Sequence, residues 1–179
     1  MSLTVRSKPL RIFSDFIPPI PFYSIIFSLM DKKASRYERV YNQLAELVIK
    51  SHDTIARMST IAAVLHHKMD GFFWTGFYLL KEDSLVVGPY QGPVACLELD
   101  KNKGVCWSGI NQEKTIVVPD VNKFPGHIAC DSRSRSEIVI PVRNQHGEIS
   151  GVLDVDSNKP DHFDETDAVW LEKIAALVA

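Results

Sequence analysis

The chain has 179 residues, which is enough for one domain with a substantial core and an extension, but too few for two average domains. Its 20 basic and 22 acidic side chains leave a formal net charge of -2, so no summed field attracts nucleic acid or an anionic membrane. We therefore expect neither of these as a partner, and expect a small molecule or another protein instead.

The N-terminal segment is apolar but cannot form an uninterrupted membrane span, because prolines and Asp15 break the run over residues 12–30. We expect residues 1–30 to be an extension, disordered or absent from the mature protein, and residues 31–179 to form the domain. Basic residues precede Asp15, namely Arg6, Lys8 and Arg11. They leave mitochondrial targeting as an alternative to a cytoplasmic location.

Two amphipathic helices are predicted next. Apolar residues recur at intervals of three and four over residues 31–50. The same spacing recurs in a second helix, which begins near Asp53 or Thr54, either of which can cap it, and continues to Met69. Gly71 is expected to end this helical part of the chain.

The middle of the chain changes to short β-rich runs separated by turn residues. The runs cover residues 72–80, 85–87, 94–99, 115–118, 137–142 and 149–155. Residues 143–148 contain Asn144 and Gly147 and are typical of a hairpin connection, and a last helix is predicted after its cap at Asp164. Helices at both ends of a strand-rich middle predict an α+β domain, with a mostly antiparallel sheet of about six strands and the terminal helices on one face.

The three cysteines are too few and too unevenly placed for the disulfide framework of a small secreted domain, which favours a reducing compartment. Their spacing lacks the close pairs that mark structural zinc, so we expect no metal. Cys106 and Cys130 fall in loops predicted over residues 100–114 and 119–136, and Cys96 follows a segment rich in glycine and proline. All three could face one pocket, where one thiol attacks and another captures the sulfenic acid as a disulfide. Three unrelated cysteines explain the pattern equally well.

Cys130 is the first candidate for a nucleophile, because it lies at the end of a polar, glycine-containing loop. His127 and Arg133 are close to it in the sequence and could favour the thiolate, which is the reactive form. For this residue taken alone, an ordinary half-buried cysteine is the better interpretation.

Acidic and aromatic residues form a second candidate group. Asp154 and Asp156 are two residues apart on a predicted strand and share a face, and Glu137 opens the preceding strand. On a pocket face, one buried acid could donate a proton to a leaving oxygen while another binds an ammonium group. The alternative is a strand-end cap and a solvent-exposed pair. Trp74 and Tyr78 also share a strand face, either as core residues or as walls of a pocket for a thioether or methyl group.

Six motifs follow one another from residue 88 onwards. They are GPYQGPVAC at residues 88–96, GVC at 104–106, PDV at 119–121, FPGHIACD at 124–131, SEIV at 136–139 and GVLDVDS at 151–157. Together they closely resemble the free methionine-(R)-sulfoxide reductases, which are GAF-domain enzymes. The resemblance extends from about Tyr37 to the C-terminus, does not include residues 1–30, and implies a single GAF domain.

The resemblance implies that the chain reduces free L-methionine-(R)-S-oxide to L-methionine. It also implies that no cofactor is bound and that thioredoxin, with NADPH and thioredoxin reductase, is the external reductant. By position, Cys130 resembles the nucleophile, Cys96 the resolving thiol and Cys106 a second or alternative one. The other matching residues are the acids that hold the sulfoxide oxygen and the amino group, Glu137, Asp154 and Asp156, and the aromatic wall of the methyl pocket, Trp74 and Tyr78. Backbone N–H groups of Ile128, Ala129 and Cys130 are expected to bind the substrate carboxylate.

One position departs from the family pattern. Trp107 stands where the family continues with glycine and small residues, and it adds bulk beside Cys106. This bulk puts a disulfide formed by Cys106 in doubt sooner than it puts the role of Cys130 in doubt.

The alternatives to an enzyme are a GAF module that only binds a small ligand and a redox sensor, since a fold does not specify an activity. We favour the enzyme, because the chain is essentially one domain that keeps the cysteines and acids together, and a homodimer through the terminal helices is expected of such domains.

Overall fold

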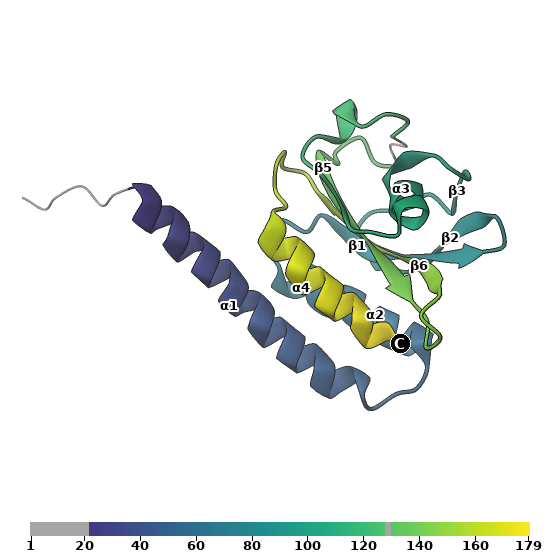
Figure 1. Ribbon diagram of the computed structural model, residues 1–179, viewed down its shortest axis with the longest axis horizontal. Coiled ribbons are helices and arrows are strands. Elements are labelled where there is room, and N and C mark those ends of the chain that lie inside the picture. The colour runs from purple at the N-terminus through teal and green to yellow at the C-terminus, as the bar shows by residue number, and fades with distance from the viewer. Residues whose placement is uncertain (1–21, 128–129) are drawn as a thin grey trace, which may run out of the picture.

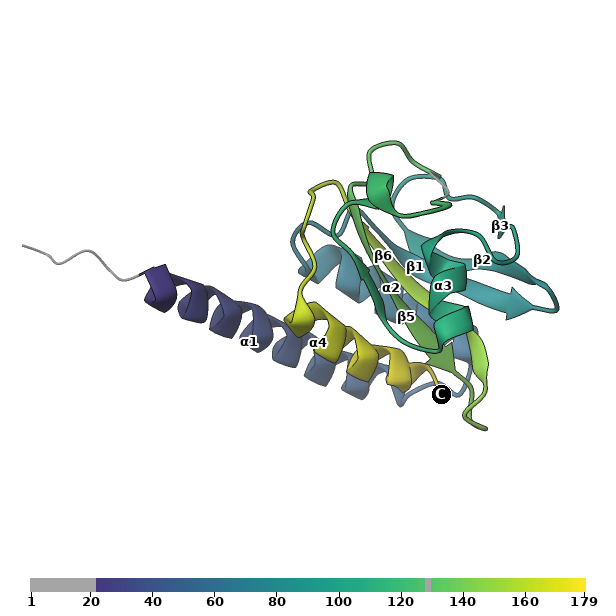
Figure 2. The same cartoon turned by 45° about the horizontal axis from the view of Figure 1, so that its top comes forward.

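The computed structural model describes residues 22–127 and 130–179. In this part of the chain, a six-stranded sheet has three helices on one face and a fourth helix on the other (Figures 1 and 2). Every pair of neighbouring strands is antiparallel, and the strand order is β3-β2-β1-β6-β5-β4. The predicted α+β class and the predicted number of strands are confirmed.

The elements lie mostly where the sequence predicts them. The helices are α1 (Phe22–Val48), α2 (Thr54–Lys68), α3 (Gly104–Gln112) and α4 (Glu165–Ala175), with 3-10 turns η1 (Val121–Lys123) and η2 (Ala176–Val178). The strands are β1 (Trp74–Lys81), β2 (Ser84–Gln91), β3 (Glu98–Leu99), β4 (Ile116–Val118), β5 (Ser136–Arg143) and β6 (Ile149–Ser157). Both predicted caps are present: Asp53 accepts a hydrogen bond from the Ala56 N–H, and Asp164 forms a capping box with Asp167.

The prediction of a loop over residues 100–114 is wrong, because α3 lies within it and carries Cys106. The helix spans only 9 residues and contains two glycines, which are poor helix formers, so its local signal is weak. Burial of Val105 and Trp107 against the sheet stabilises it instead. Tertiary packing therefore decides the structure of this segment.

Two strand boundaries also differ from the prediction. β2 continues to Gln91 through Gly88 and Pro89, because the register shift against β1 creates a bulge, where a proline is tolerated. β3 has only 2 residues, since the chain before it leaves the sheet. At the N-terminus, α1 begins at Phe22, inside the segment expected to be an extension, and the rest of that segment lies outside the described residues.

The sheet separates two apolar clusters. On one face, α1, α2 and α4 cover side chains such as Phe77, Ile140 and Leu153. On the other face, α3 and the loops cover Trp74, Tyr78 and other residues that alternate with the first set. The terminal helices thus lie on one face as predicted, and the α3 face is left for a site.

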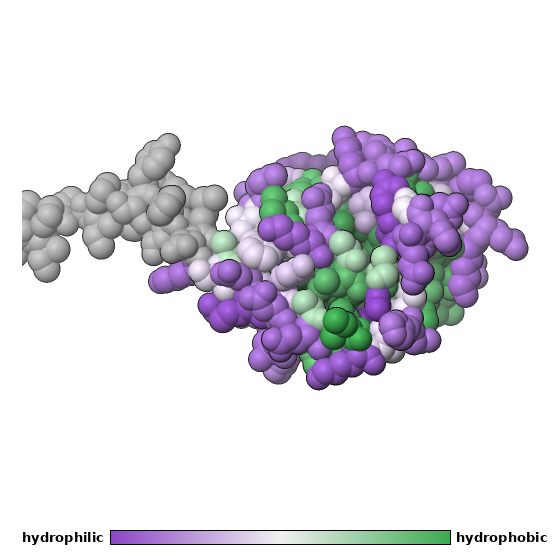
Figure 3. Space-filling view, turned by 60° about the horizontal axis from the view of Figure 1, so that its bottom comes forward, coloured by the Kyte–Doolittle hydropathy of each residue, from purple (hydrophilic) through white to green (hydrophobic). Residues whose placement is uncertain are grey.

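The outer surface of the helices carries some exposed apolar side chains among a mostly hydrophilic surface (Figure 3). Ile55 of α2 and Val169 of α4 are 47% and 40% exposed. None of the helices in the described residues combines the length and apolarity needed to cross a membrane.

Candidate active site

A cavity of about 50 Å³ lies on the α3 face of the sheet. Strands β1, β5 and β6 contribute to its wall, together with the start of α3 and residues His127, Cys130, Asp131 and Ser134. Its lining residues are Phe73, Trp74, Tyr78, Val94, Ala95, Leu99, Lys103, Gly104, Val105, Cys106, His127, Cys130, Asp131, Ser134, Glu137, Asp154 and Asp156. The cavity thus brings together two of the three cysteines and every aromatic and acidic residue that the sequence singled out.

Stacked aromatic rings form one wall of the cavity. The ring of Trp74 stacks on Tyr78 at 5.8 Å and on Tyr90 at 5.3 Å between centroids. Gly76 permits this arrangement, because a Cβ at that position would lie 2.3 Å from the Tyr90 Cβ and 2.6 Å from the Trp74 ring. The Tyr78 hydroxyl donates to the Cys96 carbonyl at 3.2 Å, which ties the wall to the loop that carries that cysteine.

Three acids from two neighbouring strands lie next to this aromatic wall, since Trp74 pairs with Asp156 in the register. Asp154 and Asp156 lie on one face of β6, and Glu137 of β5 pairs directly with Asp156 in the register. Glu137 and Asp154 are each 5% exposed, and Asp156 is half-buried. The predicted shared face is therefore confirmed, and the alternative of a solvent-exposed pair is wrong.

Burial and mutual repulsion control the charge of these acids. Burial raises the pKa of Glu137 and of Asp154 well above the usual range, and the charge of Asp156 raises both further, although hydrogen bonds with Cys106 and Glu137 oppose the shift of Asp154. Burial also raises the pKa of Asp156 to about 6, although the Ser134 hydroxyl donates to its carboxylate and opposes the shift. The group therefore combines two carboxyl groups whose protonated form is favoured with a third whose pKa lies near 6, and an acid–base site needs such a separation of pKa values.

Two buried polar atoms in the wall have no hydrogen-bond partner among the described residues. They are Oδ1 of Asp154 and Nε1 of Trp74. A buried polar atom without a partner costs about 1–3 kcal/mol, so such atoms mark strain or a missing ligand. Because both residues line the cavity, a polar ligand there would satisfy them.

Cys96 and Cys130 form a disulfide at the rim of this cavity, with their Cα atoms 5.4 Å apart. Cys130 is exposed and Cys96 is half-buried, so the bond can be reached from solvent. The two loops that carry them are 34 residues apart in sequence and meet over the α3 face. Of the two partners considered for Cys130, the structure pairs it with Cys96.

Cys106 is a free, buried thiol in the first turn of α3. Burial raises its pKa well above the usual range, and the carboxylates of Asp154, Glu137 and Asp156 raise it further. A helix N-terminus lowers the pKa of a thiol, but burial beside three acids outweighs that effect here. Cys106 is therefore a protonated thiol at neutral pH, unlike a reactive cysteine.

Trp107 is buried in the apolar cluster beneath α3, and its Nε1 donates to the Leu99 carbonyl at 3.2 Å. This contact fastens α3 to β3 and restricts movement of the helix turn that carries Cys106. The structure thereby gives a physical reason for the expectation that Trp107 disfavours a Cys106 disulfide.

Several lining residues were not singled out by the sequence. Asp131 accepts two hydrogen bonds from the Arg133 guanidinium, which lies 4.8 Å from the centre of the Phe73 ring. His127, which the sequence placed near Cys130, has its Nδ1 3.7 Å from Glu137, and burial lowers the pKa of this histidine. Asp131 and His127 fall in the FPGHIACD motif, but Phe73, Lys103 and Ser134 carry no motif that could have identified them. Ile128 and Ala129 lie outside the described residues.

Comparison with known proteins places the chain in a family. Residues 51–179 match the GAF domain. The chain is 48% identical over 147 residues to GAF domain-containing protein A of Dictyostelium discoideum, covering 82% of this chain and 92% of that protein. It is 40% identical over 124 residues to the free methionine-R-sulfoxide reductase of Escherichia coli, covering 68% and 73% of the two chains.

A solved structure agrees with the domain match and with the similarity to the Escherichia coli reductase. The free methionine-R-sulfoxide reductase of Neisseria meningitidis, solved in complex with its substrate, superposes with a TM-score of 0.78 at 43% identity, covering 82% of this chain and 87% of that one. At this identity and coverage, the likeness extends beyond the fold. The chain belongs to the GAF-domain family of free methionine-R-sulfoxide reductases.

Proposed function

We propose that this protein reduces free L-methionine-(R)-S-oxide to L-methionine. One observation carries the proposal: a solvent-accessible disulfide lies at the rim of a cavity whose buried acids include an unpartnered carboxylate oxygen. Thiol oxidation and acid catalysis are the two requirements for removing the oxygen of a sulfoxide.

Cys130 is the proposed nucleophile. In the reduced protein its thiolate attacks the sulfoxide sulfur, and a protonated acid, Glu137 or Asp154, donates a proton to the departing oxygen. The S–O bond of the substrate breaks, the oxygen passes to Cys130 as a sulfenic acid, and methionine is released. The substrate sulfur gains two electrons and the cysteine sulfur loses two. The exposure of Cys130 and its position on the cavity wall support this role.

Cys96 is the proposed resolving thiol. Its sulfur attacks the sulfenic sulfur of Cys130, water leaves, and the disulfide forms. The Cα separation of 5.4 Å lets the two sulfurs meet without rearrangement of the fold. Cys106 is the weaker candidate, because it is buried and protonated and α3 is fastened by Trp107.

Selectivity for the free amino acid is proposed to come from its charges. Ionised Asp156 binds the ammonium group, and the backbone of residues 128–130 binds the carboxylate. A peptide-linked residue has neither charge, so it leaves the half-buried carboxylate of Asp156 unpaired. Trp74 and Tyr78 supply an apolar, polarisable wall for the S-methyl group.

The activity is tested by thioredoxin-coupled NADPH consumption. We expect turnover with free methionine-(R)-sulfoxide, and none with the (S) epimer or with a peptide-linked sulfoxide. A folded protein without activity on the free (R) form would contradict the proposal and favour a GAF module that only binds a ligand. Protection of that protein from heat by methionine sulfoxide would then identify the binding function.

Thioredoxin is the proposed reductant, and no bound cofactor is needed because the electrons pass through thiols alone. Such recycling requires a reducing compartment, for which the cytoplasm is proposed. A homodimer is proposed through the outer face of the helices, where Ile55 and Val169 are exposed.

We expect Leu97→Ser to raise the KM for thioredoxin about tenfold, equivalent to about 1.4 kcal/mol. Leu97 is 74% exposed and follows Cys96 directly, so a reductant that reaches the disulfide covers its side chain. Its backbone carbonyl accepts from the Val87 N–H at 2.9 Å, and the substitution leaves this bond in place.

Dithiothreitol supplies the control, because it needs no docking surface, and turnover with it should stay unchanged in Leu97→Ser. Ile55→Ser, which removes an exposed apolar side chain from α2, should change neither assay. Equal losses with both reductants would show that Leu97 only holds the loop, and no loss with thioredoxin would exclude it from the docking surface.

A further inference from the structure

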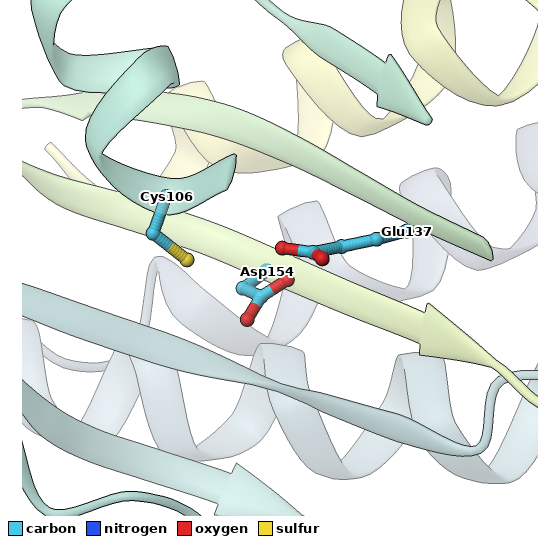
Figure 4. Close-up of side chains that lie close together, drawn as sticks. All are labelled: Cys106, Glu137 and Asp154. Carbon is cyan, nitrogen blue, oxygen red and sulfur yellow. The ribbon is translucent and has the colours of Figure 1, made fainter. Parts of the chain in front are cut away.

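We propose that the cavity also binds a thiophilic divalent cation such as Zn²⁺, held by Cys106, Glu137 and Asp154. The cysteine sulfur and one oxygen of each carboxyl group all lie within 4.8 Å of one another, and all three residues are buried. Figure 4 shows the side chains converging from α3, β5 and β6. The bound ion acts as an inhibitor and not as a resident cofactor.

The donor set suits zinc better than a hard cation. Zinc accepts cysteine sulfur at about 2.3 Å and carboxylate oxygen at about 2.0–2.2 Å, which in a tetrahedron puts the ligand atoms roughly 3.5 Å apart. The side chains therefore need to close by about 1 Å around the ion. Magnesium and calcium prefer oxygen ligands alone, so the sulfur of Cys106 selects against them.

A second observation points to a cationic ligand at this place. Oδ1 of Asp154 has no hydrogen-bond partner among the described residues, although the residue is only 5% exposed and lines the cavity. A cation satisfies this atom directly. Nδ1 of His127, 3.7 Å from Glu137, stands at the edge of the group, and water can fill the remaining position.

Binding exchanges protons for the metal and transfers no electrons. The Cys106 S–H bond breaks, a sulfur–metal bond forms, and the proton passes to solvent with those of any protonated carboxyl group. Affinity should therefore rise with pH. The Cys96–Cys130 disulfide takes no part, so the site exists in the oxidised protein as well.

Sequence spacing does not reveal these three ligands. Cys106, Glu137 and Asp154 stand on three separate elements, and only the sheet register and the packing of α3 bring them together. Because Glu137 and Asp154 are also the proposed substrate acids, the ion and methionine sulfoxide should exclude each other. That competition rests on the proposed function, whereas metal binding does not.

Cadmium titration of the oxidised protein tests the site. Two of the three cysteines are then in the disulfide, so Cys106 is the one thiol left to give an ultraviolet sulfur-to-cadmium charge-transfer band. We expect the band to saturate at one Cd²⁺ per chain and to be displaced by Zn²⁺. Where the disulfide does not form fully, the double variant Cys96→Ser/Cys130→Ser leaves the same single thiol.

Variants make the test specific. The charge-transfer band should vanish in Cys106→Ser, and the Cd²⁺ affinity should fall at least tenfold in Asp154→Asn. Asp83→Asn should keep the band and the wild-type affinity, because its carboxylate is exposed and paired with Lys101. Absence of the band, or unchanged affinity in Asp154→Asn, would overturn the proposal. An inactive protein that still shows the band would contradict only the proposed function.

Discussion

Cys130→Ser is expected to lose the reduction of free methionine-(R)-sulfoxide by at least about 1000-fold, as removal of an enzyme nucleophile does. A serine hydroxyl stays protonated and has no comparable affinity for the sulfoxide sulfur. Because Cys130 is exposed at the cavity rim, the substitution should leave the fold intact. Methionine formation, followed by amino-acid analysis with dithiothreitol as reductant, measures the effect.

The other cysteines serve as matched controls for this prediction. Cys96→Ser should still form one methionine per chain in a single turnover, but should lose turnover driven by thioredoxin, because the sulfenic acid has no resolving thiol. Cys106→Ser should keep thioredoxin-driven activity within about tenfold of wild type, since its thiol is buried and protonated. A loss in Cys106→Ser as large as that in Cys130→Ser would refute the assignment of the nucleophile.

Asp156→Asn is expected to weaken kcat/KM about 100-fold and at the same time to stabilise the fold at pH 8. The first effect follows because a charge-assisted hydrogen bond to the substrate ammonium is worth about 1.5–3 kcal/mol. The second follows because burial raises the pKa of Asp156 to about 6, so ionising it costs folding free energy. We expect the free energy of unfolding to rise by about 1–3 kcal/mol.

The sign of the stability effect depends on pH. In the unfolded chain the carboxyl group has a pKa of about 3.9, so between about pH 4 and pH 6 the folded state binds more protons than the unfolded state. In the wild type, the contribution of Asp156 to the free energy of unfolding therefore falls as pH rises from about 4 to about 6, and it falls no further above that pH. The advantage of Asp156→Asn should therefore be full at pH 8 and absent near pH 4.

Urea unfolding at the two pH values measures this difference. Asp83→Asn is the control, because its carboxylate is exposed and does not line the cavity, and it should show no comparable gain. An Asp156→Asn variant that is less stable than wild type at pH 8 would show that the hydrogen bond from Ser134 outweighs the cost of burial.

Local patterns in the sequence predict those parts of the molecule whose signals are local. The caps at Asp53 and Asp164 depend on the capping residue and its first turn, and both are found where expected. The shared face of Asp154 and Asp156 follows from strand alternation alone. The hairpin over residues 143–148 follows from Asn144 and from Gly147, which has φ of +80°.

Long-range packing decides the parts that the sequence does not predict. No local signal distinguishes α3 from a loop, because its glycines disfavour a helix and only burial of Val105 and Trp107 compensates. The same helix turns Cys106 toward Glu137 and Asp154, which makes it a buried thiol instead of a loop cysteine. Whether residues such as Phe73 and Ser134 line the cavity depends on where the loops cross the sheet, and the neighbouring sequence does not indicate this.

The pairing of the cysteines illustrates the same division. The sequence shows three candidates, and family resemblance suggests Cys130 as the nucleophile, Cys96 as the resolving thiol and Cys106 as a second or alternative one. The structure separates them by placing two at the rim and one in the interior.

A single turnover of the fully reduced protein with free methionine-(R)-sulfoxide, followed by peptide mapping, tests whether Cys130 and Cys96 carry out the reduction. We expect one methionine released per chain and a Cys96–Cys130 disulfide, with Cys106 still alkylatable after unfolding. Release of no methionine, or a disulfide that joins Cys130 to Cys106, would contradict this expectation.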